Sequence, residues 1–170
     1  MDTCVSVVIV CMNNLKNLYP CLDSIIKYTN VSYEILVTAF MFSHENLEKA
    51  RHDYPNVIFI ESNDLRGFSE NNNLALRQAK GKYCFIVNDD TFIKSPVIDS
   101  LVNSFNKLPN DVAIVSPNIK YPDGREQICG RREYNWLSWL KSLLRIKEKS
   151  ESTYENQNGL FQSYNISGAA

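Results

Sequence analysis

Residues 5–10 read Val5-Ser6-Val7-Val8-Ile9-Val10. A run of β-branched residues with almost no polar alternation is typical of a strand that is covered on both faces, as in a parallel sheet. Asn13 and Asn14 follow this run, and apolar residues then recur at helical spacing, at Leu15, Leu18, Leu22, Ile25 and Ile26. The N-terminal part of the chain therefore predicts one β-loop-α unit.

The same alternation continues along the chain. Strands are expected at 33–37, 57–60, 83–87 and 112–115, and helices at 46–54, at 69–79 and after Ser95, which would cap a helix whose first residue is Pro96. Such alternation predicts an α/β fold in which a mainly parallel sheet is flanked by helices and ligands bind beyond the carboxyl ends of the strands. We assign this core to residues 1–120.

The pattern becomes irregular over residues 121–170, which we expect to belong to the same domain. A turn is predicted at Tyr121-Pro122-Asp123-Gly124, and an amphipathic, basic helix at 136–149. The helix carries Trp136, Leu137, Leu140, Leu143 and Leu144 at helical spacing, with Lys141, Arg145, Lys147 and Lys149 beside them. Two interpretations stay open: the apolar face packs on the protein or a partner subunit, or it lies on a membrane surface.

The composition excludes several classes of protein. With 170 residues, 44% of them hydrophobic, the chain can bury the core of one domain. A formal net charge of −1 argues against nucleic acid as the main partner. The five cysteines are an odd number without Cys-x-x-Cys spacing, which argues against a zinc site or a disulfide framework and suits the cytoplasm. No segment approaches the roughly 20 apolar residues of a membrane span.

The strongest indication of chemistry is Asn88-Asp89-Asp90-Thr91, directly after the predicted strand 83–87. In extended backbone, Asn88 and Asp90 would point to one side and Asp89 to the other. A carboxylate and an amide oxygen at a strand end make a weak, open site for Mn²⁺ or Mg²⁺, which could offset charge on a leaving diphosphate. Taken alone, these residues would be interpreted as a solvated loop that helps to cap the helix after Ser95.

Three segments together resemble the family-2 glycosyltransferases, particularly the rhamnosyltransferase-like branch. They are the run 5–10, then Gly67-Phe68-Ser69-Glu70-Asn71-Asn72-Asn73-Leu74-Ala75-Leu76, then Gly81-Lys82-Tyr83-Cys84-Phe85-Ile86-Val87-Asn88-Asp89-Asp90-Thr91. The resemblance implies a GT-A, Rossmann-like fold that binds a nucleoside-diphosphate sugar, such as a UDP- or dTDP-sugar. It further implies transfer with inversion to a saccharide or a lipid-linked acceptor, as in polysaccharide biosynthesis.

The resemblance also implies roles for single residues. Asp90 matches the metal-binding aspartate, and Asn88 stands in the place of the first acid of that motif. Donor contacts are implied for the loop residues Cys11, Asn13 and Asn14 near the base and for Asn72 and Asn73 near the sugar and diphosphate. Arg66, before Gly67 at the mouth of the sheet, has the planar fork of donors that suits phosphate. Without the resemblance, these side chains would be interpreted as caps, turn residues and solvated surface groups.

Two departures from the family's pattern suggest an alternative. After strand 33–37 the family has an aspartate that reads the base, whereas this chain has Thr38 and then Phe40-Met41-Phe42. We expect the Thr38 hydroxyl to contact the donor in place of that carboxylate. The second departure is the catalytic base, which takes the proton of the acceptor and which we expect to lie beyond Ala170. We also expect the apolar surface around 40–42 and 136–144 to favour self-association. The alternative is a non-catalytic nucleotide-binding or interaction module, truncated or degenerate. A dinucleotide-binding enzyme is excluded because no Gly-x-Gly-x-x-Gly follows the first strand.

Overall fold

The computed structural model describes residues 3–127, 130–131, 136–144 and 165–166. Its contacts divide the chain into two compact units, Met1–Val115 and Ser116–Ala169. The boundary at residue 120 inferred from sequence stays a prediction. In the first unit the elements follow one another as β1 (Val5–Met12), α1 (Leu15–Tyr28), β2 (Tyr33–Phe40), α2 (His44–Asp53), β3 (Val57–Ser62), α3 (Phe68–Leu76), β4 (Tyr83–Asn88) and α4 (Val97–Phe105).

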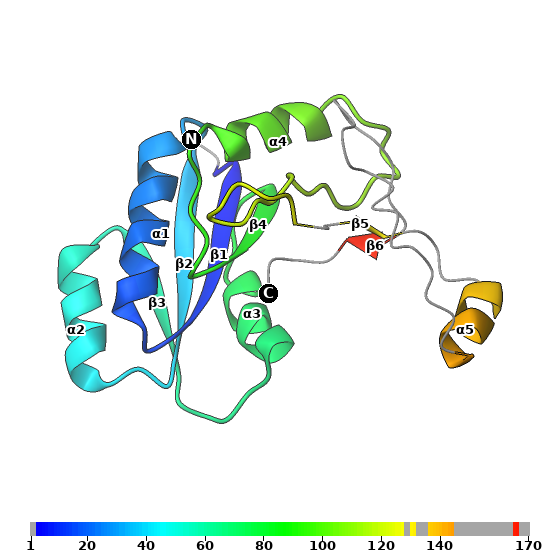
Figure 1. The fold of residues 1–170 in the computed structure, drawn as a ribbon. Coiled ribbons are helices and arrows are strands. Elements are labelled where there is room, and N and C mark those ends of the chain that lie inside the picture. The colour runs from blue at the N-terminus through cyan, green and yellow to red at the C-terminus, as the bar shows by residue number, and fades with distance from the viewer. Residues whose placement is uncertain (1–2, 128–129, 132–135, 145–164, 167–170) are drawn as a thin grey trace. The chain divides into compact units, whose positions relative to one another are not determined.

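The four strands of the first unit form one parallel sheet in the order β3-β2-β1-β4 (Figure 1). Strand β1 pairs with β2 from Val5↔Tyr33 onward and with β4 from Val5↔Tyr83 onward. Consecutive strands are therefore connected through helices, as parallel pairing requires. The predicted α/β fold, a parallel sheet flanked by helices, is confirmed.

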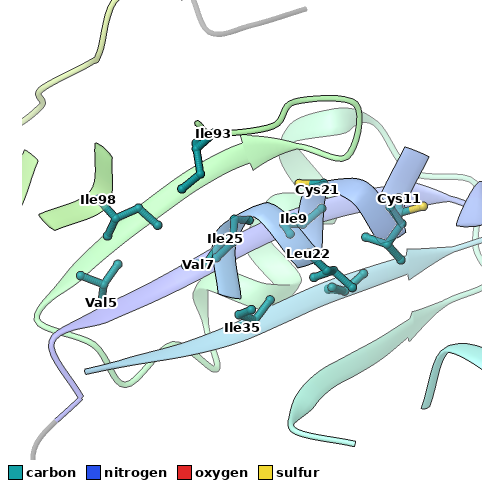
Figure 2. Close-up of a cluster of buried hydrophobic side chains, with 12 residues drawn as sticks. Val5, Val7, Ile9, Cys11, Cys21, Leu22, Ile25, Ile35, Ile93 and Ile98 are labelled. Atoms are coloured by element: carbon teal, nitrogen blue, oxygen red, sulfur yellow. The ribbon is translucent and has the colours of Figure 1, made fainter. Parts of the chain in front are cut away.

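The sheet is covered on both faces. Helices α1 and α4 contribute Leu18, Leu22 and Ile98 to the larger apolar cluster. These side chains lie against Val7 and Ile9 of β1 and Ile35 of β2. Figure 2 shows this cluster, with Cys21 and Leu22 of α1 near Ile9 of β1. On the opposite face, α3 places Ala75 against Val8 and Leu36. The unbroken run 5–10 is explained by this arrangement, because both sets of β1 side chains are buried.

A polar junction joins three strands at the end of the sheet where β1 begins. Ser6 Oγ donates to Glu34 Oε1 at 2.6 Å and accepts from the backbone N–H of Gly81 at 2.8 Å. Lys80 N donates to the same carboxylate oxygen, also at 2.6 Å. A Cβ on Gly81 would lie 2.4 Å from the backbone nitrogen of Ser6, so only glycine fits there.

The second unit is described in part. Strands β5 (Gly130–Arg131) and β6 (Asn165–Ile166) pair antiparallel, and α5 runs from Trp136 to Leu143. The predicted turn at 121–124 is present, closed by Gly124 N donating to Tyr121 O at 2.9 Å. The predicted helix is thus observed over its first eight residues, and 145–149 lie outside the described residues. No helix in the described segments has the length and apolar character needed to cross a membrane.

Two sequence predictions were wrong in detail. Residues 112–115 form no strand, because their backbone makes no ladder hydrogen bonds with β4, although their side chains line a groove beside β4 and α4. Helix α4 begins at Val97, one residue after the predicted first residue, Pro96. Pro96 is therefore the N-cap in place of Ser95, and no side chain caps the helix. The strand at 112–115 was predicted from its apolar residues alone. A strand also requires a neighbouring strand with which its backbone forms hydrogen bonds.

Replacing Gly81 tests the polar junction. We expect Gly81→Ala to lower the free energy of unfolding by about 1–3 kcal/mol, since the added methyl group would overlap backbone atoms that cannot move aside cheaply. Urea unfolding measures the change. The matched control is Gly67→Ala, where the nearest atom to an added Cβ is 3.7 Å away, and which should cost less than about 1 kcal/mol as a mild capping effect. Equal losses in the two variants would contradict the close approach at Gly81.

Candidate functional site

An open cleft of about 410 Å³ lies at the carboxyl ends of the parallel strands. The strand register explains its composition, because Val10 is aligned with Thr38 and with Asn88, and Met12 with Phe40, so these side chains share one face of the sheet. The same face carries α3. The residues that line the cleft are Val10, Met12, Asn14, Asn17, Phe40, Arg66, Phe68, Asn71, Asn88, Asp89 and Asp90.

The acidic segment of the cleft is a turn. Strand β4 ends at Asn88, and the N–H of Thr91 donates to Asn88 O at 3.2 Å. Because the backbone is no longer extended after Asn88, strand alternation does not by itself set the directions of Asp89 and Asp90, although Asp89 does bond Cys11 on the α1 side of the sheet, as the alternation predicted. All three residues line the cleft, including Asp89, which sequence reasoning had directed away.

Two buried thiols lie beneath this turn. Cys21 Sγ on α1 contacts the carbonyl oxygen of Asn88 at 3.6 Å, and Cys11 Sγ on β1 contacts Asn14 O at 3.5 Å. Burial raises the pKa of Cys21 to about 12, and burial together with a hydrogen bond to Asp89 raises that of Cys11 further. Both sulfurs are thus neutral donors. Cys11 supports the cleft from below, where it is fully buried and does not line it.

Burial and the neighbouring Asp90 raise the pKa of the Asp89 carboxyl group, while its hydrogen bond with Cys11 acts in the opposite direction. Two carboxyl groups side by side disfavour each other's charged form, and a cation between them would relieve this repulsion. In the part of the chain that the structure describes, no cluster of three or more His, Cys, Asp or Glu side chains is present. The carboxylate and amide oxygens of this turn are the kind of ligand that a hard divalent cation prefers.

The loop after β1 divides its two asparagines between different tasks. Asn14 caps α1, accepting from Asn17 N at 3.3 Å, and lines the cleft. Asn13 has a φ of 49°, and its Oδ1 accepts from Ser43 N and from Asn46 Nδ2 at 3.0 and 2.9 Å. Its side chain ties the loop to the start of α2. The hydrogen bonds of the Asn13 side chain favour this structural role over a direct contact with a ligand in the cleft.

Thr38 lies under the cleft floor. It is fully buried, and its hydroxyl donates to the carbonyl oxygen of Asn71 at 2.9 Å. The side chain of Asn71 accepts from Ser62 Oγ at 2.8 Å and donates to the carbonyl oxygens of Arg66 and Gly67 at 3.2 Å. Thr38 was expected to contact a ligand through this hydroxyl, which instead holds α3. Sequence reasoning missed Asn71, although the run Asn71-Asn72-Asn73 marks the helix turn that contains it.

Arg66 is the one cation among the residues that line the cleft. One of its terminal nitrogens pairs with Asp64 at 2.6 Å, whereas its buried Nε has no hydrogen-bond partner among the described residues. An unsatisfied buried donor is costly unless a ligand or water meets it. Among the residues that line the cleft, Arg66 is thus the one whose side chain suits an anion.

The two remaining candidates do not line the cleft. Asn72 is 5% exposed, and its Nδ2 donates to Phe68 O at 2.9 Å while its Oδ1 has no partner among the described residues. Asn73 is exposed on α3. Of the candidate residues, the structure brings together Asn14, Arg66, Asn88 and Asp90. It adds Asn17, one helical turn after Asn14, and the apolar wall of Met12, Phe40 and Phe68.

A model of the family described as "Glycosyl transferase family 2" matches residues 6–164. The chain belongs to glycosyl transferase family 2. The comparison with curated proteins gives no significant match.

Solved structures of glycosyltransferases share the fold of this family 2 chain. Residues 1–349 of TarS from S. aureus with UDP superpose with a TM-score of 0.56 at 17% identity, over 72% of this chain and 43% of that one. The mannosyltransferase PcManGT from Pyrobaculum calidifontis, solved with GDP-Man and Mn2+, gives 0.56 at 20% identity, over 72% and 37%. The chain therefore spans less than half the length of these proteins.

A strained residue directly after β2 can be tested by substitution. Met41 has a φ of 52°, a left-handed conformation that L side chains other than asparagine rarely adopt. We expect Met41→Gly to raise the free energy of unfolding by about 1 kcal/mol, because strain of that order is removed. Thermal unfolding measures the change. The control, Met12→Gly, removes the same side chain from a strand end with ordinary φ and should destabilise by about 0.5–1 kcal/mol. Destabilisation by both would refute the strain at Met41.

Proposed function

We propose that the chain binds a nucleoside-diphosphate sugar in the cleft and transfers the sugar, with inversion, to a saccharide or a lipid-linked acceptor. The observation that carries this proposal is that Arg66 and the acidic turn Asn88–Asp90 line one cleft at the carboxyl ends of the sheet. A diphosphate needs both a cationic donor group and a means of offsetting its charge. Membership of glycosyl transferase family 2 supports the same reaction class.

A divalent ion, Mn²⁺ or Mg²⁺, would be held by Asp90 and Asn88, with Asp89 beside them. The donor set fits: carboxylate and amide oxygens are hard ligands, and their small number leaves positions for phosphate oxygens and water. When bound, the ion supplies positive charge that offsets the charge developing on the leaving diphosphate. Asp90 is exposed and thus accessible from the cleft, which suits this role.

The remaining donor contacts are assigned by position. Arg66 would bind the diphosphate through its guanidinium group, and Asn14 would lie beside the base. We keep Asn72 and Asn73 as residues on the sugar side of the donor, although neither lines the cleft, so this assignment requires the sugar to extend beyond it along α3. Cys11, Asn13 and Thr38 would serve the donor indirectly, by holding the loops that carry these groups.

The donor is proposed to be a UDP- or dTDP-sugar and the chain to belong to the rhamnosyltransferase-like branch. TarS has been solved with UDP and with UDP-GlcNAc, and PcManGT with GDP-Man and Mn2+, which supports a nucleotide-sugar donor without choosing the base. We place the protein in the cytoplasm, peripheral to the inner face of the membrane. The free cysteines Cys4, Cys11, Cys21 and Cys84 suit a reducing compartment.

Inverting transfer also needs a carboxylate that accepts the proton of the acceptor hydroxyl. Asp123 is a poor candidate, because its oxygens accept from Arg125 N at 3.0 Å and Arg125 Nε at 2.7 Å, and the first of these bonds is the main cause of its lowered pKa. Glu126 lies 3.8 Å from Lys120. We therefore assign no base to the described residues.

A second candidate function is a nucleotide-binding module without transferase activity. The observation that favours it is the state of Thr38, which is fully buried with its hydroxyl engaged by α3 and cannot replace a base-reading carboxylate. Released nucleoside diphosphate separates the two candidates, because a binding module would show ligand-induced stabilisation with no release from any acceptor mixture.

The test of donor binding is a thermal-shift panel of UDP-, dTDP- and GDP-sugars with and without Mn²⁺. A ligand at a free concentration of about 100 times its dissociation constant stabilises the folded protein by about 2.7 kcal/mol, and this change is readily measured. We expect a UDP- or dTDP-sugar to raise the melting temperature most, and only with the metal. Equal melting temperatures across the whole panel would refute the proposed donor class.

Asp90 should carry most of the metal dependence. We expect Asp90→Asn to weaken Mn²⁺-dependent nucleotide binding at least about tenfold, since a neutral amide replaces the exposed carboxylate of the site. Isothermal titration calorimetry measures this change. Glu45→Gln removes one negative charge from an exposed position on α2 and should leave affinity unaltered. A similar loss in both variants would point to net charge and not to a site at Asp90.

Arg66 should matter even without metal. We expect Arg66→Gln to weaken metal-free binding of the nucleoside diphosphate about tenfold, the effect of losing a charge-assisted hydrogen bond. Arg77→Gln, at the exposed end of α3, removes the same charge and is the matched control. Unchanged affinity in the Arg66 variant would remove the diphosphate contact from the proposal.

A further inference from the structure

Helix α5 presents an apolar face that the proposed chemistry does not use. Every large apolar side chain described on it and just after it is exposed, with Trp136 at 72% and Leu143 at 65%. At about 100° per residue these positions fall within an arc of roughly 160°. The exposed residues are Trp136, Leu137, Trp139, Leu140, Leu143 and Leu144, and the sequence places Ser138, Lys141 and Ser142 on the remaining arc.

The charge around this helix differs from the rest of the chain. Residues 131–149 contain six of the eighteen basic residues and only two of the nineteen acidic ones. Their net charge of +4 lies in a chain whose total is −1, so the remainder carries −5. A basic, apolar segment in an otherwise acidic protein favours an anionic partner that also accepts apolar side chains.

We propose that α5 is an interfacial helix that docks this protein on the surface of an anionic lipid bilayer. Tryptophan is suited to the boundary between headgroups and acyl chains, where its ring is buried and its N–H stays hydrated. A helix of eight residues is about 12 Å long, so it lies in the plane of the interface and does not cross the membrane. The net positive charge of residues 131–149 favours anionic lipids.

A membrane fits these observations better than a protein partner. Interfacial helices combine a wide apolar face with tryptophan, leucine and flanking lysine or arginine, which is the composition found here. A protein interface is enriched in arginine and aromatic residues and depleted in lysine at its core. Three of the six basic residues in 131–149 are lysines, and all three lie within or after the helix. The inference does not depend on the proposed transferase activity.

The chain contains its own probe for this docking. Trp136 and Trp139 are its two tryptophans, so intrinsic tryptophan fluorescence reports on α5 alone. We expect vesicles of phosphatidylglycerol and phosphatidylcholine to shift the emission to shorter wavelength, and the protein to co-sediment with them. Vesicles of phosphatidylcholine alone should bind at least about tenfold more weakly, and added salt should reduce binding to the anionic vesicles.

Two charge-matched variants separate apolar insertion from simple electrostatic attraction. Leu140→Glu places a charge in the middle of the apolar arc and should weaken vesicle binding at least about tenfold beyond the effect of the added charge. Ser142→Glu adds the same charge on the opposite arc and should retain binding close to that of the unaltered chain. Circular dichroism and thermal unfolding of both variants establish that each is folded.

Three results would overturn the proposal. One is an emission spectrum that does not respond to anionic vesicles, and another is equal loss of binding in the two variants. The third is a blue-shifted, quencher-protected emission without lipid in a protein that sedimentation shows to be a dimer, because a second copy then covers α5. Nucleotide-induced stabilisation serves as the separate readout for the cleft and should be unaltered by Leu140→Glu.

Discussion

Strand β1 is hydrogen-bonded along both of its edges, to β2 on one side and to β4 on the other, always in parallel. This pairing brings the carboxyl ends of strands that are far apart in sequence to one edge of the sheet. Val10 is aligned with both Thr38 and Asn88 through it. If β1 were displaced by one residue, its buried and cleft-facing side chains would exchange faces, and the acidic turn would no longer adjoin the loops after β1 and β2.

The cleft floor depends on a chain of buried hydrogen bonds that adds to this register. Thr38 holds α3 through Asn71, and Asn71 in turn holds Ser62 and the carbonyl groups of Arg66 and Gly67. Buried polar networks of this kind specify one arrangement when every member is satisfied. The position of the Arg66 loop is therefore coupled to a threonine at the end of β2. A buried residue can therefore decide where a residue of the cleft lining lies.

The end of β2 has a structural role at the cleft. The chain has no carboxylate at Thr38, and the following residues place Phe40 on the cleft wall and Met41 in a left-handed conformation. Strain of this kind persists only where the surroundings enforce it. Here the backbone N–H of Met41 donates to Ser62 O at 2.9 Å, which ties the end of β2 to the end of β3.

Most of the fold could be predicted from the sequence because its information is local. The run 5–10, the helical spacing from Leu15 to Ile26 and the repeated β-loop-α order indicated a parallel sheet, and the strand cores were found within a few residues. The strand at 112–115 was predicted wrongly for the converse reason. Its composition suits a strand, but pairing with β4 is a non-local property that composition does not contain.

The candidate site divides in the same way. By itself the sequence determined which chemistry is available: one acidic turn after β4, one arginine before Gly67 and paired asparagines at the start of two helices. Only the tertiary structure decided which of these side chains meet. It brought Asp89 into the cleft because the strand ends at Asn88, turned Asn13 toward α2, and engaged Thr38 beneath α3. Two properties depend on residues that are tens of positions away in the sequence. They are the direction of a side chain after the last hydrogen bond of a strand and the choice of its hydrogen-bond partner. For that physical reason no local sequence pattern predicts either of them.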